Sequence, residues 1–149
     1  MDRRLLAPDP AQIDADWMTQ ALRRAGLLGD GSRVASVSAR GVGNGLVGDS
    51  FRFSLTYDGD ATGAPASVVG KFPAKDPASR KSGTDHMLYI REVSFYRELA
   101  KTVGIHTPRA LVAEIDPATD DFTLIFEDLG PARQGDQLTG CSLDRKSTR

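Results

Sequence analysis

Apolar and polar residues alternate in one stretch of the chain with the period of a β-strand. From residue 50 to residue 57, the aromatic or aliphatic positions are Phe51, Phe53, Leu55 and Tyr57, and the positions between them are Ser50, Arg52, Ser54 and Thr56. Because successive side chains of a strand point to opposite faces, this pattern predicts a half-buried strand.

Four more short runs, rich in β-branched or aromatic residues, predict further strands at 34–39, 67–72, 110–115 and 122–126. Turn-forming residues fill segments 58–65 and 116–121, which separate consecutive strands. The sequence therefore predicts an α+β fold with a five-stranded antiparallel sheet and one helix inserted before the fourth strand.

An apolar stripe at helical spacing also occurs near the N-terminus. It begins after a residue suited to capping, Asp14, and ends before Gly26. The stripe consists of Ile13, Trp17, Ala21, Leu22 and Ala25. We expect this helix to pack against the sheet.

The strongest helical pattern covers residues 87–103. Its predicted apolar stripe consists of Leu88, Phe95, Leu99 and Val103, with Tyr96 at the edge. Glu92 falls on the same stripe, because it follows Leu88 by one helical turn. The preceding polar segment, 74–85, is expected to be exposed and mobile.

A carboxylate on an apolar helix face requires a cation, because leaving it buried and unpaired is strongly destabilising. Lys71 lies within the apolar strand run 67–72 and requires an acid for the same reason. We therefore expect Lys71 and Glu92 to pair. The alternative is that Glu92 reaches out to a surface arginine such as Arg91 or Arg97.

A glycine-rich segment with the pattern G-x-G-x-x-G joins the first two predicted strands, at residues 43–48. In a dinucleotide-binding fold these glycines open a helix, whereas here a strand follows them and no alternating strand–helix units are present. A nicotinamide-dependent oxidoreductase is therefore disfavoured. A glycine hairpin followed by a lysine-bearing strand is typical of kinases, and a plain hairpin with a surface lysine is the alternative.

Composition and charge argue against nucleic acids and membranes as partners. Of 149 residues, 40% are apolar and 26% are charged, and the net charge is -1, which suits one modest globular domain. No run of Lys and Arg is long enough to follow nucleic-acid phosphates, and no apolar run has the length of a membrane span or of a signal-peptide core. We expect a cytoplasmic protein. Cys141, His86 and His106 lie in no metal-ligand spacing and are interpreted as structural.

Several segments together resemble one group of enzymes. They are the glycine loop and residues 68–72 (VVGKF), 91–99 (REVSFYREL) and 126–129 (FEDL). These segments are similar to the aminoglycoside phosphotransferase and ecdysteroid or choline kinase-like families, which are small-molecule kinases with a protein-kinase-like fold. The loop lacks the aromatic tip and the following valine of protein kinases, which favours a small-molecule kinase.

The resemblance implies that the residues of the glycine loop cover the phosphates of ATP. These residues are Gly43, Asn44 and Gly45. In the same template Lys71 contacts the α- and β-phosphates, and Glu92 holds the lysine in place.

The resemblance also implies an adenine site at the end of the fifth predicted strand. Phe126 would lie beside the base, and the backbone carbonyl of Glu127 and the backbone N–H of Leu129 would bind its edge.

The resemblance further indicates which parts of such an enzyme the sequence lacks. In this family the catalytic aspartate and the metal ligands lie on a helical C-terminal lobe, and no His-Gly-Asp or comparable segment occurs here. The expected division is an N-terminal helical extension (1–30), a kinase-like N-lobe (31–128), and a hinge with the start of a linker to a missing C-lobe (129–143). We expect the whole enzyme to use Mg²⁺ and this fragment to be inactive.

The last six residues, 144–149, match the translation of a sequencing adapter. Their sequence, Asp-Arg-Lys-Ser-Thr-Arg, is the translation of GATCGGAAGAGCACACGT, a common short-read sequencing adapter. We expect these residues not to be native, and resequencing of the locus tests this.

Two function classes remain open from the sequence alone. One is the ATP-binding lobe of a phosphotransferase acting on a hydroxyl of a small molecule, where aminoglycoside, choline, sugar and steroid-like acceptors all fit. The other is a non-catalytic binding or interaction module that uses the same sheet.

Overall fold

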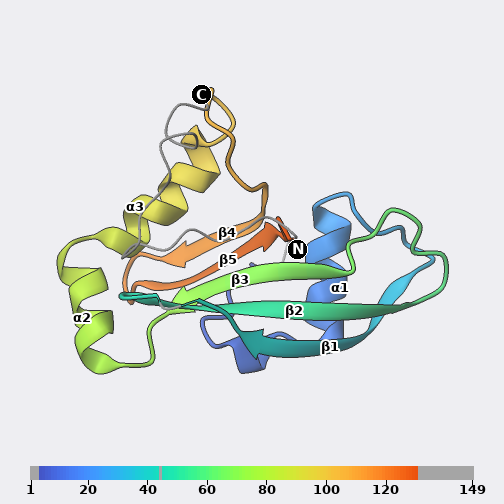
Figure 1. The fold of residues 1–149 in the computed structure, drawn as a ribbon, viewed down its shortest axis with the longest axis horizontal. Helices are drawn as coiled ribbons and strands as arrows, with labels where there is room; N and C mark the ends of the chain where they lie inside the picture. The colour runs from blue at the N-terminus through green and yellow to red at the C-terminus, as the bar shows by residue number, and fades with distance from the viewer. Residues whose placement is uncertain (1–3, 44, 131–149) are drawn as a thin grey trace, which may run out of the picture.

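Five strands form one open antiparallel sheet in the computed structural model, which describes residues 4–43 and 45–130 (Figure 1). The strands are β1 (Arg33–Gly41), β2 (Gly48–Asp58), β3 (Ser67–Pro73), β4 (Ala110–Asp116) and β5 (Asp121–Glu127). Their order across the sheet is β1-β2-β3-β5-β4, and every neighbouring pair is antiparallel. The predicted α+β fold and its five strands are confirmed.

The predicted N-terminal helix is also present, as α1 (Ala15–Arg24), and a short 3-10 turn, η1 (Pro10–Gln12), precedes it. The Asp14 carboxylate accepts a hydrogen bond from the Trp17 N–H at 2.7 Å, which satisfies one free N–H of the first turn. The helix packs on the sheet as expected, with Met18 and Leu22 in the same core as Phe53.

The two faces of the sheet are covered differently. Strand β5 shows this, since Ile125 points into the core beneath α1 whereas Leu124 and Phe126 belong to a second core beneath helix α3 (Leu88–Ser94). On this second face α3 packs mainly over β4 and β5. The part of the face formed by β1, β2 and β3 is therefore left available for a cavity.

Residues 74–85 are mostly exposed, as expected, but they also form a regular element that was not predicted. They include a helix, α2 (Pro77–Asp85), and both Ala74 and Gly83 are buried. The carboxylate of Asp76 caps α2 by accepting a hydrogen bond from the Ser79 N–H at 2.8 Å. The sequence pattern did not reveal α2, because the residues of this helix are almost all small or polar and form no apolar stripe.

The predicted helix over 87–103 is shorter than expected, and its predicted buried face is wrong. Met87, with a left-handed φ of 54°, separates α2 from α3, and a π-helical turn, η2 (Phe95–Leu99), continues α3. The buried residues of α3 are Tyr89 and Val93, whereas Leu88 is 37% exposed and Leu99 is 53% exposed. A π turn is wider than an α turn, so it rotates the positions after Ser94 away from the expected stripe.

In the part of the chain that the structure describes, none of the helices combines the length and apolar character needed to cross a membrane.

Candidate functional site

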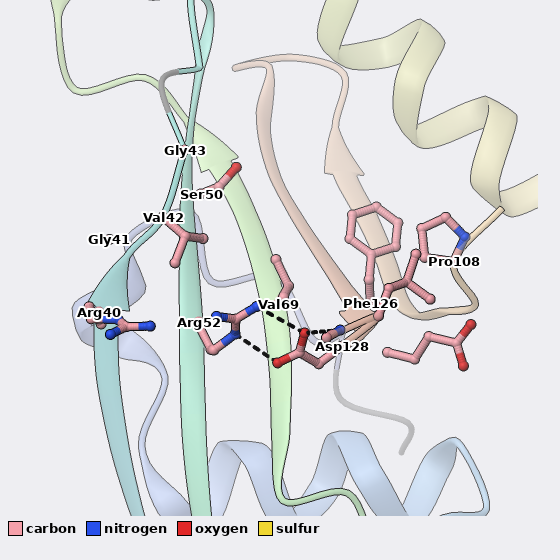
Figure 2. A pocket seen from close by; sticks show the side chains of 13 residues that line it. Arg40, Gly41, Val42, Gly43, Ser50, Arg52, Val69, Pro108, Phe126 and Asp128 are labelled. Atoms are coloured by element: carbon pink, nitrogen blue, oxygen red, sulfur yellow. Dashed lines mark hydrogen bonds and ion pairs between the residues drawn. The ribbon is translucent and has the colours of Figure 1, made fainter. Parts of the chain in front are cut away.

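A cavity of about 670 Å³ lies on the open part of the second sheet face (Figure 2). Its lining residues come from the β1–β2 hairpin, from the middle of β3, and from the segment that ends β5. They are Arg40, Gly41, Val42, Gly43, Ser50, Arg52, Val69, Pro108, Phe126, Glu127, Asp128, Leu129 and Gly130. This volume falls within the range of small-molecule binding pockets.

Apolar side chains from three different strands or strand ends line the cavity. Val69 on β3 and Phe126 on β5 are direct partners in the sheet, so their side chains lie on the same face. Val42 faces them from the end of β1 (Figure 2). Such walls suit the two faces of a flat apolar ring system.

Tyr96 supports Phe126 from behind the cavity wall. The two ring centroids lie 4.6 Å apart in an edge-to-face arrangement. Burial, and then the negative charge of Glu92, raise the pKa of Tyr96 above its ordinary value. Tyr96 therefore contacts the aromatic wall and is influenced by the charge of Glu92.

The predicted ion pair between Lys71 and Glu92 is present. The Lys71 Nζ lies 2.7 Å from Oε1 and 2.8 Å from Oε2 of Glu92, so the lysine contacts both carboxylate oxygens. The alternative, in which Glu92 turns out to a surface arginine, is wrong. The pair is half-buried rather than buried, because the exposed fractions of the two side chains are 28% and 30%.

The glycine turn, which is the described part of the glycine-rich segment 43–48, lies next to this pair. Gly48 is close to Lys71, since a Cβ added at Gly48 would lie 3.2 Å from the Lys71 Cε and 3.2 Å from the Phe72 carbonyl oxygen. A side chain at this position would press on the lysine. The absence of one at Gly48 therefore allows Lys71 to extend beside the turn towards Glu92.

A smaller hollow of about 220 Å³ adjoins the inner side of the turn. It is lined by Gly41, Val42, Gly43, Gly45, Gly48, Asp49, Ser50 and Phe51. Ser50 lines both this hollow and the larger cavity, and it is the sheet partner of Lys71. The lysine, the turn and the larger cavity are therefore neighbours on one sheet face.

A second ion pair, between Arg52 and Asp128, crosses the cavity wall and was not predicted. The Arg52 guanidinium donates two hydrogen bonds to the Asp128 carboxylate, at 2.7 and 3.1 Å (Figure 2). Asp128 also accepts hydrogen bonds from the Ser67 hydroxyl at 2.6 Å and from the Gly130 N–H at 3.0 Å.

These contacts stabilise the charged form of Asp128. The hydrogen bond from Arg52 is the largest cause of a pKa lowered to about 2, the bonds from Ser67 and Gly130 add to it, and partial burial acts in the opposite direction. Asp128 therefore fastens the segment after β5 to the adjacent strand β3 and, across it, to β2.

The structure brings most of the predicted site residues together, in two groups. Gly43, Phe126, Glu127 and Leu129 line the large cavity, and Gly43 and Gly45 line the smaller hollow. Lys71 and Glu92 line neither of these spaces and lie beside the turn. Asn44 lies outside the described residues, as does Cys141.

Glu127 has a further contact that the sequence did not indicate. Its side-chain carboxylate accepts a hydrogen bond from the Arg109 N–H at 2.9 Å, and its own backbone N–H donates to the Arg109 carbonyl at 3.0 Å. The segment before β4 and the end of β5 are thereby fixed to each other at the cavity rim.

Residues 4–43 and 45–130 contain no group of three or more His, Cys, Asp or Glu side chains placed to hold a metal ion. Of the two histidines, His86 caps the end of α2, where its ring nitrogen Nδ1 lies 2.9 Å from the Ser82 carbonyl oxygen.

Comparison of the chain with protein-family models, with curated proteins and with solved structures gave no match.

Proposed function

We propose that this chain is the nucleotide-binding lobe of an ATP-dependent phosphotransferase that acts on a hydroxyl of a small molecule. The observation that carries the proposal is the Lys71–Glu92 pair, held at 2.7 Å beside a glycine turn and on the same sheet face as the large cavity. In kinases, a lysine that pairs with a glutamate on a helix binds the phosphates of ATP.

The residues present fit a purine nucleotide. Val42, Val69 and Phe126 would hold the base between apolar walls, and the backbone from Glu127 to Leu129 would meet its polar edge. Lys71 would then meet the phosphates next to the turn that contains Gly43 and Gly45. ATP would supply the phosphoryl group that is transferred.

The Mg²⁺ of the proposed enzyme has no cluster of ligands among the described residues.

Calorimetric titration of the 149-residue chain with ATP and with NAD tests the proposal. We expect ATP to bind more tightly than NAD, and Lys71→Met to weaken ATP binding about tenfold or more, because a charge-assisted hydrogen bond to a phosphate is lost. Lys75→Met is the matched control, since Lys75 is 67% exposed and lies 3.8 Å from its partner Asp9.

Equal loss of affinity in the two lysine variants, or tighter binding of NAD than of ATP, would refute the proposal. A phosphoryl-transfer assay adds a second test. The chain alone is expected to show no turnover, and clear turnover would contradict the assignment of the catalytic groups to a second lobe.

A further inference from the structure

A second contact joins α3 to the glycine turn, one helical turn away from Glu92. The Tyr89 side chain is only 2% exposed, and its hydroxyl donates a hydrogen bond to the Val47 carbonyl oxygen at 2.5 Å. The same hydroxyl accepts a hydrogen bond from the Ala74 N–H at 3.3 Å. One phenol oxygen therefore bridges the end of the turn and the chain just after β3.

The ring of Tyr89 is held firmly in this position. Its centroid lies 4.8 Å from that of Phe122 on β5. On α2, Gly83 provides the space for the ring, because a Cβ added there would lie 2.3 Å from a Tyr89 ring carbon. The orientation of the hydroxyl is thus fixed by α2 and by the sheet together.

The described residues of the turn have little side-chain packing of their own to hold them. Leu46, directly before Val47, is 78% exposed. Val47 is followed by Gly48, which begins β2 and lies against Lys71. A hydrogen bond at Val47 therefore fixes the point where the turn enters the strand beside the lysine.

We propose that Tyr89 is the positioning residue of the glycine turn, and that α3 fixes the positions of both the turn and Lys71. Through Tyr89 the helix holds the carbonyl of Val47, and through Glu92 it holds the ammonium group of Lys71. A displacement of α3 would release both contacts at once. The part of this inference that concerns nucleotide affinity rests on the proposed function, and the part that concerns ordering of the turn does not.

Tyr89→Phe tests the inference, because it removes the hydroxyl and keeps the ring. The matched control is Tyr57→Phe, which removes another phenol-to-carbonyl hydrogen bond of 2.5 Å, to Pro65, near the opposite end of β2. Amide hydrogen exchange is measured without nucleotide. We expect the amides of residues 45–49 to exchange about fivefold faster in Tyr89→Phe and at the wild-type rate in Tyr57→Phe.

Gly83→Ala gives a second, independent perturbation. Its methyl group would push the Tyr89 ring away while the phenol itself is kept, and alanine favours the helical conformation of α2. We expect the same local increase in exchange. Unchanged exchange at residues 45–49 in both variants would overturn the inference, even if ATP binds.

Nucleotide titration then separates the two proposals. If the turn meets the phosphates, Tyr89→Phe weakens ATP binding about fivefold and leaves adenosine binding unchanged. Equal weakening of both ligands would overturn the positioning role. Absence of ATP binding by the wild-type chain would refute the proposed function, while the exchange measurement still decides whether Tyr89 orders the turn.

Discussion

Two ion pairs on the same sheet face differ in how they are bonded. Arg52–Asp128 has two hydrogen bonds between the partners and further donors from Ser67 and Gly130, and the Asp128 side chain is only 11% exposed. For Lys71–Glu92, the hydrogen bonds among the described residues join the two partners only, and each side chain is nearly one-third exposed.

The difference indicates different roles for the two pairs. A carboxylate with four donors cannot change partners without breaking all of these bonds, so Asp128 holds strands together. A half-buried ammonium group keeps a solvent-facing side that can contact an anion, which is the role proposed for Lys71, with Glu92 to orient it. The comparison therefore predicts a structural pair and a ligand-binding pair.

The largest effect on stability is expected from Asp128→Ala. It removes the acceptor of Arg52, Ser67 and Gly130 at once, which should lower the free energy of unfolding by about 2 kcal/mol. For a chain of this size that corresponds to a fall in melting temperature of roughly 4–8 °C. Thermal unfolding followed by circular dichroism measures it, and a change below that of an exposed substitution such as Asp58→Ala, whose partner Arg33 lies on the surface, would contradict the structural role.

A part of this stabilisation is expected to depend on pH. Because the pKa of Asp128 falls to about 2 in the folded chain from 3.8, the contribution of its charge is complete above about pH 4 and is lost as the pH falls toward 2. Urea unfolding at pH 6, 4 and 3 should show the stability gap between wild type and Asp128→Asn narrowing only below pH 4. A gap that stays constant down to pH 3 would show that the charge of Asp128 contributes nothing.

The smallest effect on stability is expected from Glu92→Gln. A pair with this exposure contributes at most about 1 kcal/mol to the free energy of unfolding, because solvent screens it. Affinity for ATP should nevertheless fall about fivefold, since Lys71 loses the group that orients it. Glu114→Gln is the control, because Glu114 also forms ion pairs, with Arg4 and Arg97, away from the cavity. Equal ATP affinity in the two variants would remove the functional difference between the pairs.

The strands and the Lys71–Glu92 pair could be predicted because their signals are local or chemically restrictive. Alternation identified β2, and the pairing followed from two charges in apolar runs. The pair was nevertheless predicted from a buried stripe that is in fact exposed at Leu88 and Leu99. What remained valid was the separation of Lys71 and Glu92 along the chain, which allows a short connection to bring Glu92 on α3 back to Lys71 on β3.

Arg52–Asp128 and Tyr89 could not be predicted in the same way. Asp128 follows Arg52 by 76 residues, and their contact requires β5 to lie next to β3, which the sequence pattern does not specify. Tyr89 does not belong to the expected stripe, and its burial was not predicted. For α2 a signal was present, since Asp76 followed by Pro77 is a typical helix start.

The strand order has a consequence for folding. Strands β1, β2 and β3 pair with their neighbours along the chain, as do β4 and β5, whereas β3 and β5 come together across an intervening stretch that contains α2 and α3. Local hairpins close faster than distant segments meet, so the β3–β5 pairing should be a late event. Val69 and Phe126 come to lie side by side in the cavity wall only once that pairing has formed, so ligand binding in the cavity would report completion of folding.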